Sequence, residues 1–268
     1  MWKPSKYFLY ENSVQSPEAH VELLAQIASA MAPKKVFRRM REDFCGTFLI
    51  SCEWVKTHPQ NTALGLDLDP EPVAYGKKTH WSRLTADQRR RLRIEQRNVI
   101  SVTRPRVDLV VAANFSFYIF KRRSLLLEYF RKVRASLSQG GLFILEMAGG
   151  PGMIQSMREW KPVYVRSGSA RKRFTYVWDQ LSFDPITHDV RYAIHFHVGG
   201  RKIESAFEYD WRLWTIPEVR DALIEAGFKG TAVFWETEDE NGEGTGEYEL
   251  RQNGDNAVSW IAQVVGHL

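Results

Sequence analysis

A short glycine turn between a predicted strand and a predicted helix constrains the fold of this chain more than any other feature. Residues 42–47 read Glu-Asp-Phe-Cys-Gly-Thr, and an apolar helical pattern begins directly behind them at Phe48. A second predicted strand ends at Asp67, about 20 residues after Gly46, which is the spacing of a doubly wound α/β sheet. The pattern therefore predicts a parallel sheet with a binding site at the carboxyl ends of its strands.

The residues around this turn indicate an adenosine-type ligand. Positions 45–47 carry small residues, so the backbone can approach a ligand closely, and the helix behind them presents unpaired N–H groups. Asp67 is placed to accept hydrogen bonds from ribose hydroxyls. The other role open to Asp67 is to cap the next helix, but Asp69 suits that role better because Pro70 follows it directly.

The turn resembles the first motif of class I S-adenosylmethionine (SAM)-dependent methyltransferases. Glu42 falls at the acidic position of that motif and Gly46 at its central glycine, whereas Phe44 and Phe48 stand where the family usually has glycine. The resemblance covers roughly residues 15–268. It implies a Rossmann-like, doubly wound, seven-stranded methyltransferase sheet with an antiparallel β insertion.

The resemblance also implies that SAM is the cofactor and that S-adenosylhomocysteine is the product. The cofactor-binding residues implied in this way are Arg41, Glu42, Asp43, Cys45, Gly46, Thr47, Asp67, Leu68, Asn98, Val99 and Asn114. By the same analogy Leu68 packs against the adenine, and Tyr7, Tyr10 and Gln15 close over the cofactor as a lid.

Several of these residues have an alternative role. Arg41 pairs with the methionine carboxylate, or it neutralises Glu42 or Asp43. Asn98 accepts a hydrogen bond from the adenine amino group, or it only forms a turn. Residues 114–117 read Asn-Phe-Ser-Phe and lack the two prolines of the motif found in some amino-methyltransferases. That departure disfavours a nucleobase or glutamine N-methyltransferase.

Strand and helix patterns alternate over the first half of the chain, which indicates right-handed βαβ crossovers. The predicted strands there are 36–41, 62–66, 92–96, 107–112 and 142–147. The predicted helices are 17–31, 71–81, 86–91 and 124–137, the last of them closed by Gly140-Gly141, and a further helix is expected over 215–226. Two final strands are expected at 233–235 and 258–265.

The pattern changes to alternating polar and apolar residues after position 150. Strands at 174–183, 190–198 and 202–213 are predicted to form an antiparallel meander. We therefore expect residues 1–150 and 213–268 to form the SAM-binding domain and residues 151–212 to form a substrate lid. The acidic, glycine-rich stretch 236–249 is expected to be an exposed loop.

The insertion also offers candidates for catalysis. His195 and His197 share one face of a strand, where they could act as a general base or as half of a metal site, and Tyr209 follows in the next strand. No third ligand is visible, so no metal is predicted. Methyl transfer from a sulfonium depends mainly on positioning, so the sequence identifies the donor better than the acceptor.

Charge and composition limit the partners. The net charge is +5, and basic clusters occur at 89–93, 121–123 and 171–173. Solvated surface is the favoured interpretation of these clusters, and nucleic-acid binding is the alternative. The chain has two cysteines, no apolar run of about 18 residues and no signal-peptide pattern at its start. We therefore expect a cytoplasmic protein that does not span a membrane.

Together these features predict a SAM-dependent methyltransferase that modifies nitrogen or oxygen of a small-molecule acceptor. One alternative is an RNA or protein methyltransferase that uses the arginine-rich faces. Another is a non-catalytic protein that binds SAM or S-adenosylhomocysteine. A dinucleotide oxidoreductase is disfavoured by the missing glycines. The acceptor and the oligomeric state stay open.

Overall fold

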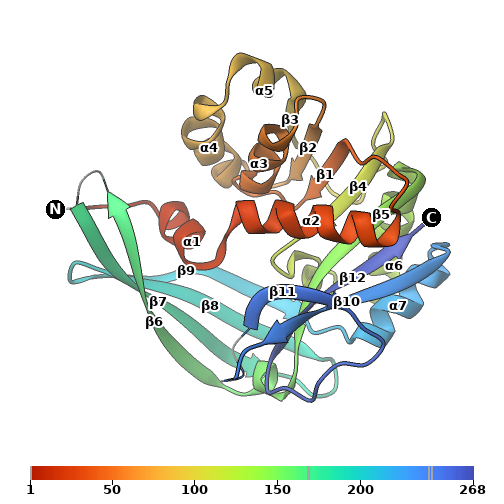
Figure 1. The fold of residues 1–268 in the computed structure, drawn as a ribbon. Coiled ribbons are helices and arrows are strands. Elements are labelled where there is room, and N and C mark those ends of the chain that lie inside the picture. The colour runs from red at the N-terminus through yellow and green to blue at the C-terminus, as the bar shows by residue number, and fades with distance from the viewer. Residues whose placement is uncertain (1, 168–169, 241, 243) are drawn as a thin grey trace.

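A twisted mixed sheet forms the centre of the computed structural model, which describes residues 2–167, 170–240, 242 and 244–268 (Figure 1). Its strands are β1 (Arg39–Asp43), β2 (Thr62–Asp67), β3 (Leu92–Gln96), β4 (Val107–Ala112), β5 (Leu137–Gly149), β10 (Gly230–Glu238), β11 (Gly244–Leu250) and β12 (Trp260–His267). Their order is β11-β10-β12-β5-β4-β1-β2-β3. The pairings among β1–β5 are parallel, whereas β12 runs antiparallel to both β5 and β10.

Helices cover both faces of this sheet. They are α1 (Lys6–Val14), α2 (Pro17–Met31), α3 (Leu49–Thr57), α4 (Pro70–Thr79), α5 (Ala86–Arg91), α6 (Arg123–Ser136) and α7 (Ile216–Glu225), with short 3-10 turns at Trp81–Arg83, Ser116–Ile119 and Pro151–Ile154. Strand β4 shows how the faces divide, because Leu109 packs in the same core as α2 and α3, and Val110 packs in the core of α6 and α7. The predicted doubly wound α/β class is confirmed.

Most predicted elements have the expected positions, and the differences have local causes. Strand β1 begins at Arg39 and not at Val36, and its arginines are neutralised by Asp108 and Asp43. Strand β5 begins at Leu137, immediately after α6, because that side chain is buried and pairs with Val107. The prediction that Gly140 and Gly141 close the helix was therefore wrong.

A second sheet of four antiparallel strands follows β5. Its strands, in order, are β6 (Met157–Ser167), β7 (Ala170–Phe183), β8 (Asp189–Val198) and β9 (Arg201–Arg212). Three were predicted, and β6 was missed because Pro162 interrupts its pattern. Proline is tolerated in β6 because this strand lies at the edge of the sheet. In Figure 1 the sheet curves beneath α1, with one face toward the rest of the molecule and the other away from it.

The acidic stretch after α7 is not the loop that was expected. It forms the β10–β11 hairpin at the edge of the central sheet, so the sheet has eight strands and not seven. The Thr237 and Thr245 hydroxyls hydrogen-bond across the hairpin, and Gly246 N–H donates to Glu236 at 3.0 Å. Positions 241 and 243 of the predicted loop lie outside the described residues. Acidic side chains on an edge strand oppose pairing with other chains.

In the part of the chain that the structure describes, no helix combines the length and the apolar character needed to cross a bilayer.

Candidate functional site

A cavity of about 700 Å³ lies where the carboxyl ends of β1, β2 and β4 meet α1 and β9. Its lining includes the turn 42–47, the end of β2 at Asp67, and Ala113, Asn114 and Ser116 after β4. Tyr7 and Tyr10 of α1 and residues 207–211 of β9 complete it from the other side. The cavity therefore lies at the sheet edge where doubly wound folds bind ligands, and the second sheet contributes to its wall.

Asp67 is fixed beside the glycine turn by two backbone donors. Gly46 N–H donates to Oδ2 of Asp67 at 2.7 Å, and Asp69 N–H donates to Oδ1 at 2.9 Å. Burial raises the pKa of Asp67, and these N–H groups oppose the shift. Gly46 has φ +50°, and a Cβ built there would meet nothing within 4 Å. The turn therefore presents open backbone next to an oriented carboxyl group, as expected for a nucleoside site.

The two phenylalanines that replace family glycines take the backbone conformation that glycine favours. Phe44 has φ 55° and Phe48 has φ 51°, and the Phe48 side chain is fully buried. Asn114 and Phe115, in the loop across the cavity, have φ 54° and 56°. Left-handed backbone is costly for such residues and gathers at functional sites. The buried Glu146 holds the Asn114 loop by accepting a hydrogen bond from its N–H.

Glu42 is buried beneath the turn, where Ser51 N–H donates to its Oε2 at 2.8 Å and the Ser51 hydroxyl donates to the same atom. Burial raises the pKa of Glu42 to about 7, and the Ser51 hydrogen bonds oppose this shift. Between the usual carboxyl range and pH 7, Glu42 therefore binds a proton in the folded state more readily than in the unfolded state. The protein is for this reason more stable at the acidic end of that pH range.

We expect the free energy of unfolding to fall by up to about 3 kcal/mol as the pH rises from 4.5 to 7, from this group alone. Glu42→Gln should remove that part of the slope, because a neutral amide does not titrate. Urea unfolding of both proteins across this pH range measures the difference. Equal slopes would show that Glu42 is not protonated in the folded state near neutral pH.

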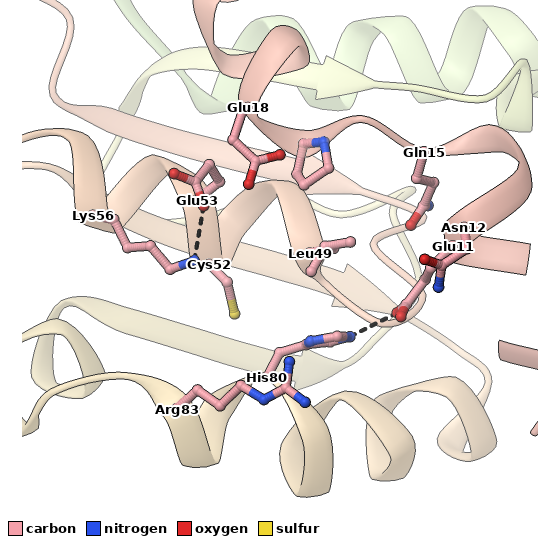
Figure 2. A pocket seen from close by; sticks show the side chains of 11 residues that line it. Glu11, Asn12, Gln15, Glu18, Leu49, Cys52, Glu53, Lys56, His80 and Arg83 are labelled. Atoms are coloured by element: carbon pink, nitrogen blue, oxygen red, sulfur yellow. Dashed lines mark hydrogen bonds and ion pairs between the residues drawn. The ribbon is translucent and has the colours of Figure 1, made fainter. Parts of the chain in front are cut away.

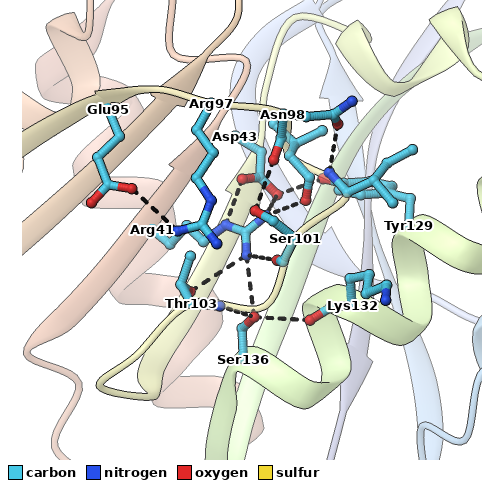
Figure 3. Close-up of polar contacts among 12 residues, drawn as sticks. Arg41, Asp43, Glu95, Arg97, Asn98, Ser101, Thr103, Tyr129, Lys132 and Ser136 are labelled. Carbon is cyan, nitrogen blue, oxygen red and sulfur yellow. Dashed lines mark hydrogen bonds and ion pairs between the residues drawn. The ribbon is translucent and has the colours of Figure 1, made fainter.

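Arg41 does not reach the cavity, which corrects its assignment as a cofactor contact. Its side chain is fully buried, with Nε 2.6 Å from Asp43 Oδ1 and Nη2 3.1 Å from Asp43 Oδ2 (Figure 3). It also donates to the carbonyls of Val99 and Ser101 at 2.6 and 2.9 Å. The alternative role, neutralising Asp43, is the one that the structure shows. Arg41 thereby ties β1 to the loop after β3.

Three other residues assigned to the cofactor lie outside the cavity lining. Asn98 Oδ1 accepts a hydrogen bond from Ile100 N–H at 2.8 Å, so Asn98 forms the turn that was its alternative role. Val99 is buried, and its carbonyl is bound by Arg41. Leu68 is 60% exposed beside the end of β2. Contacts of these residues with a bound adenine stay predictions, whereas Glu42, Asp43, Cys45, Gly46, Thr47, Asp67 and Asn114 all line the cavity.

The two histidines of β8 lie on the far side of the second sheet, so the structure does not support them as a general base at this cavity. His195 is buried between carboxylates, with Nε2 3.2 Å from Asp179 and Nδ1 2.9 Å from Glu204. The ring of His197 packs against Trp160 at 5.1 Å. Tyr209 does line the cavity, because it lies on the opposite face. Strand alternation explains the separation.

Helix α1 is joined to the turn by a buried polar chain that the sequence did not reveal. Thr47 Oγ1 donates to Glu11 at 2.6 Å, and His80 Nε2 lies 2.6 Å from the same Glu11 oxygen. Figure 2 shows the Glu11–His80 pair beside a second cavity of about 320 Å³. Gln15 lines both cavities. The position of α1 over the turn fits the lid that was expected from analogy.

Tyr10 of α1 meets Tyr209 of β9 inside the larger cavity. Burial raises the pKa of Tyr10 to about 12 and that of Tyr209 well above its ordinary value. Both hydroxyls are therefore neutral hydrogen-bonding groups near pH 7. Phe207 and Glu208, which also line this wall, were missed by sequence reasoning. Alternation along β9 from Tyr209 could have identified Phe207, since both share one face.

Several solved structures that resemble this chain are methyltransferases. A SAM-dependent methyltransferase from Clostridium acetobutylicum is 14% identical with a TM-score of 0.67, over 96% of each chain. SAM-bound CalS10, an amino pentose methyltransferase from Micromonospora echinaspora, is 16% identical with a TM-score of 0.67, over 98% of each chain. The sugar N-methyltransferase KedS8 from Streptoalloteichus is 16% identical with a TM-score of 0.64, over 98% of this chain and 93% of the other. No protein-family model and no curated protein matches the chain.

Proposed function

We propose that this chain, which has the fold of class I SAM-dependent methyltransferases, is itself such an enzyme and methylates an amine of a small-molecule acceptor. The observation that carries the proposal is the open Gly46 backbone beside the oriented Asp67 carboxyl group, at the switch point of this fold. In this assignment residues 1–150 and 213–268 bind the cofactor, and residues 151–212 cover the acceptor.

SAM supplies an activated methyl group and a neutral leaving group, so the chain has to align the acceptor and exclude water. Helix α1 covers one side of the cavity, held by Glu11 and by a Lys6–Glu71 ion pair of 3.0 Å. The Tyr10 and Tyr209 hydroxyls offer neutral hydrogen-bonding groups to an acceptor. Both rings lie against Phe207 or Trp211, which limits their freedom.

The charge of the lining favours an amine over a hydroxyl acceptor. Of the six acidic residues in the lining, Asp43 is neutralised by Arg41 and Asp210 by Lys121, and Lys6 is the other basic residue of the lining. Both lysines are already engaged, Lys6 with Glu71 and Lys121 with Asp189 and Asp210. Asp67 and Asp69 line the cavity and form no ion pair with any residue in the described ranges. An ammonium group is therefore attracted to this wall before it loses its proton.

The binding step can be tested directly by calorimetric titration with SAM and S-adenosylhomocysteine, with NAD as the control ligand. We expect micromolar affinity for the first two and none for NAD. Turnover is then followed with methyl-labelled SAM on matched amines and alcohols. Binding of NAD alone would contradict the proposed cofactor, and tight SAM binding without turnover of any acceptor would favour a non-catalytic role.

Asp69→Asn, which keeps the helix-capping side chain, should raise the KM of an amine acceptor about fivefold at low salt, with a smaller effect on kcat, because one partly exposed charge is worth about 1 kcal/mol. Initial rates at several acceptor concentrations separate the two constants. Glu128→Gln, on the exposed side of α6, is the matched control and should behave like the natural protein. Equal KM values for all three proteins would exclude the Asp69 charge from acceptor recognition.

A further inference from the structure

The second sheet has two chemically different faces. Aromatic rings such as Phe174, Trp178 and Tyr209 cover the face toward α1 and the cavity. The opposite face carries a group that we call the outer basic face, which consists of Trp160, Tyr164, Arg166, Arg171, Arg173 and Lys202. Strand register places them together, since Tyr164 pairs with Arg173, Arg166 pairs with Arg171, and Lys202 pairs with His197, whose ring packs on Trp160.

The cations of this face have no acidic partner among the residues that the structure describes. Arg166 and Arg171 are directly opposite each other on neighbouring strands, an arrangement that is destabilising for like charges. Within the described ranges, the three arginines form no ion pair, and neither does Lys202. The face therefore holds a concentration of positive charge that an anion would relieve.

The other two basic clusters of the sequence are engaged within the chain, which sets this face apart. Arg89 donates to the carbonyls of Trp81 and Ser82, and Arg91 pairs with Asp87 at 2.9 Å. Lys121 pairs with Asp189 and Asp210. Arg123 pairs with Glu225 at 2.5 Å. For these two clusters the structure supports the interpretation as ordinary protein surface.

Two half-exposed aromatic rings lie among the free cations. Tyr164 is 53% exposed, and the Arg171 guanidinium carbon lies 4.7 Å from its ring centroid. Trp160 is 50% exposed on the same strand, about 13 Å away at the usual rise per residue. The linear sequence showed no aromatic residues among the arginines of 171–173, because the rings come from the neighbouring strand β6.

We propose that the outer basic face binds single-stranded nucleic acid. Unpaired guanidinium groups suit phosphates, and exposed rings between them suit stacking of unpaired bases, which is the combination that single-strand binding surfaces use. The exposed apolar groups among these cations are aromatic rings and not aliphatic side chains. This favours nucleic-acid bases over lipid acyl chains as the groups that the face binds. The face lies on the side of the sheet opposite the cavity, so this binding goes beyond the proposed methyl transfer and does not depend on it.

The test measures fluorescence anisotropy of a labelled single-stranded RNA of about 12 nucleotides, within the site sizes of such surfaces. We expect micromolar binding at low salt. With about three phosphates neutralised, the logarithm of the association constant should fall with the logarithm of the salt concentration at a slope of about −2. Arg171→Ala/Arg173→Ala should weaken binding at least about tenfold and reduce the slope by about 1.4.

Trp160→Ala should weaken RNA binding about tenfold and leave the salt slope unchanged, because it removes stacking without removing charge. The charge-matched control is Arg90→Ala/Arg93→Ala, which removes two exposed arginines from the cluster near α5. This control should bind like the natural protein, and circular dichroism confirms that each variant is folded.

Three results would overturn the proposal. Equal weakening in the control and in Arg171→Ala/Arg173→Ala would show attraction to net charge alone. Binding to vesicles that contain phosphatidylserine, without binding to RNA, would assign the face to a membrane surface. A dimer in sedimentation velocity that Trp160→Ala converts to a monomer would assign the face to a second copy of this chain, whose β10–β11 hairpin is acidic.

Discussion

Asp67→Ala is expected to weaken SAM binding by at least about 100-fold. The carboxyl group lies at the end of β2, at the edge of the cavity, and its orientation is set by the N–H groups of Gly46 and Asp69. Each hydrogen bond to a charged group contributes about 1.5–3 kcal/mol, so the loss of two ribose contacts accounts for this factor. Calorimetric titration of the two proteins with SAM measures the change.

The matched control for Asp67→Ala is Asp69→Ser. Asp69 also lines the cavity, and its side chain caps α4 by accepting a hydrogen bond from Glu71 N–H at 2.9 Å. Serine keeps the capping function and removes the charge. We expect Asp69→Ser to bind SAM within a few-fold of the natural protein. If both variants lose affinity equally, Asp67 acts through the local negative charge and does not contact the ribose.

Arg41→Met is expected to destabilise the protein by about 3–5 kcal/mol, the usual cost of removing one partner of a buried ion pair. The substitution leaves the Asp43 carboxylate buried, and among the described residues the Tyr129 hydroxyl, 2.8 Å away, is its one remaining side-chain donor. It also removes the donors to the carbonyls of Val99 and Ser101. Urea unfolding at pH 7 measures the loss of stability, and SAM affinity serves as a second readout.

The pH dependence of Arg41→Met separates charge from packing. Burial raises the pKa of Asp43, and Arg41 opposes the shift in the natural protein. Without Arg41 the pKa rises further, so folding takes up a proton and the variant gains stability as the pH falls toward the usual carboxyl range. Arg41→Met/Asp43→Asn should lack this gain. A deficit that is constant from pH 7 to pH 5 would show that packing, and not the unpaired charge, causes the instability.

The parts of the fold that were predicted correctly are those in which one local pattern decides the structure. A near-continuous apolar run such as 107–112 is typical of a parallel strand that is covered on both faces of its sheet. It forms β4, in which every residue is buried. The turn 42–47 and Asp67 were recognised because backbone approach requires small residues and ribose recognition requires a carboxylate at a fixed spacing.

The features that were missed depend on pairing between distant segments. Residues 157–167 become a strand only because β7 offers them a partner, and the acidic hairpin exists because β10 provides a template. Glu11 reaches Thr47 across 36 positions of the sequence, so no local signal marks it. His195 and His197 share a face as predicted, but which face meets the cavity depends on the curvature of the whole second sheet.

The position of β12 has a consequence for how the chain reaches its native state. This strand, residues 260–267, lies between β5 and β10 and pairs with both. During synthesis, β1–β5 can assemble early, but the β10–β11 hairpin has no place to dock until β12 has emerged from the ribosome. A stop codon before Trp260 should therefore leave the hairpin detached and its apolar face open to aggregation, although every residue of the cofactor turn would still be made.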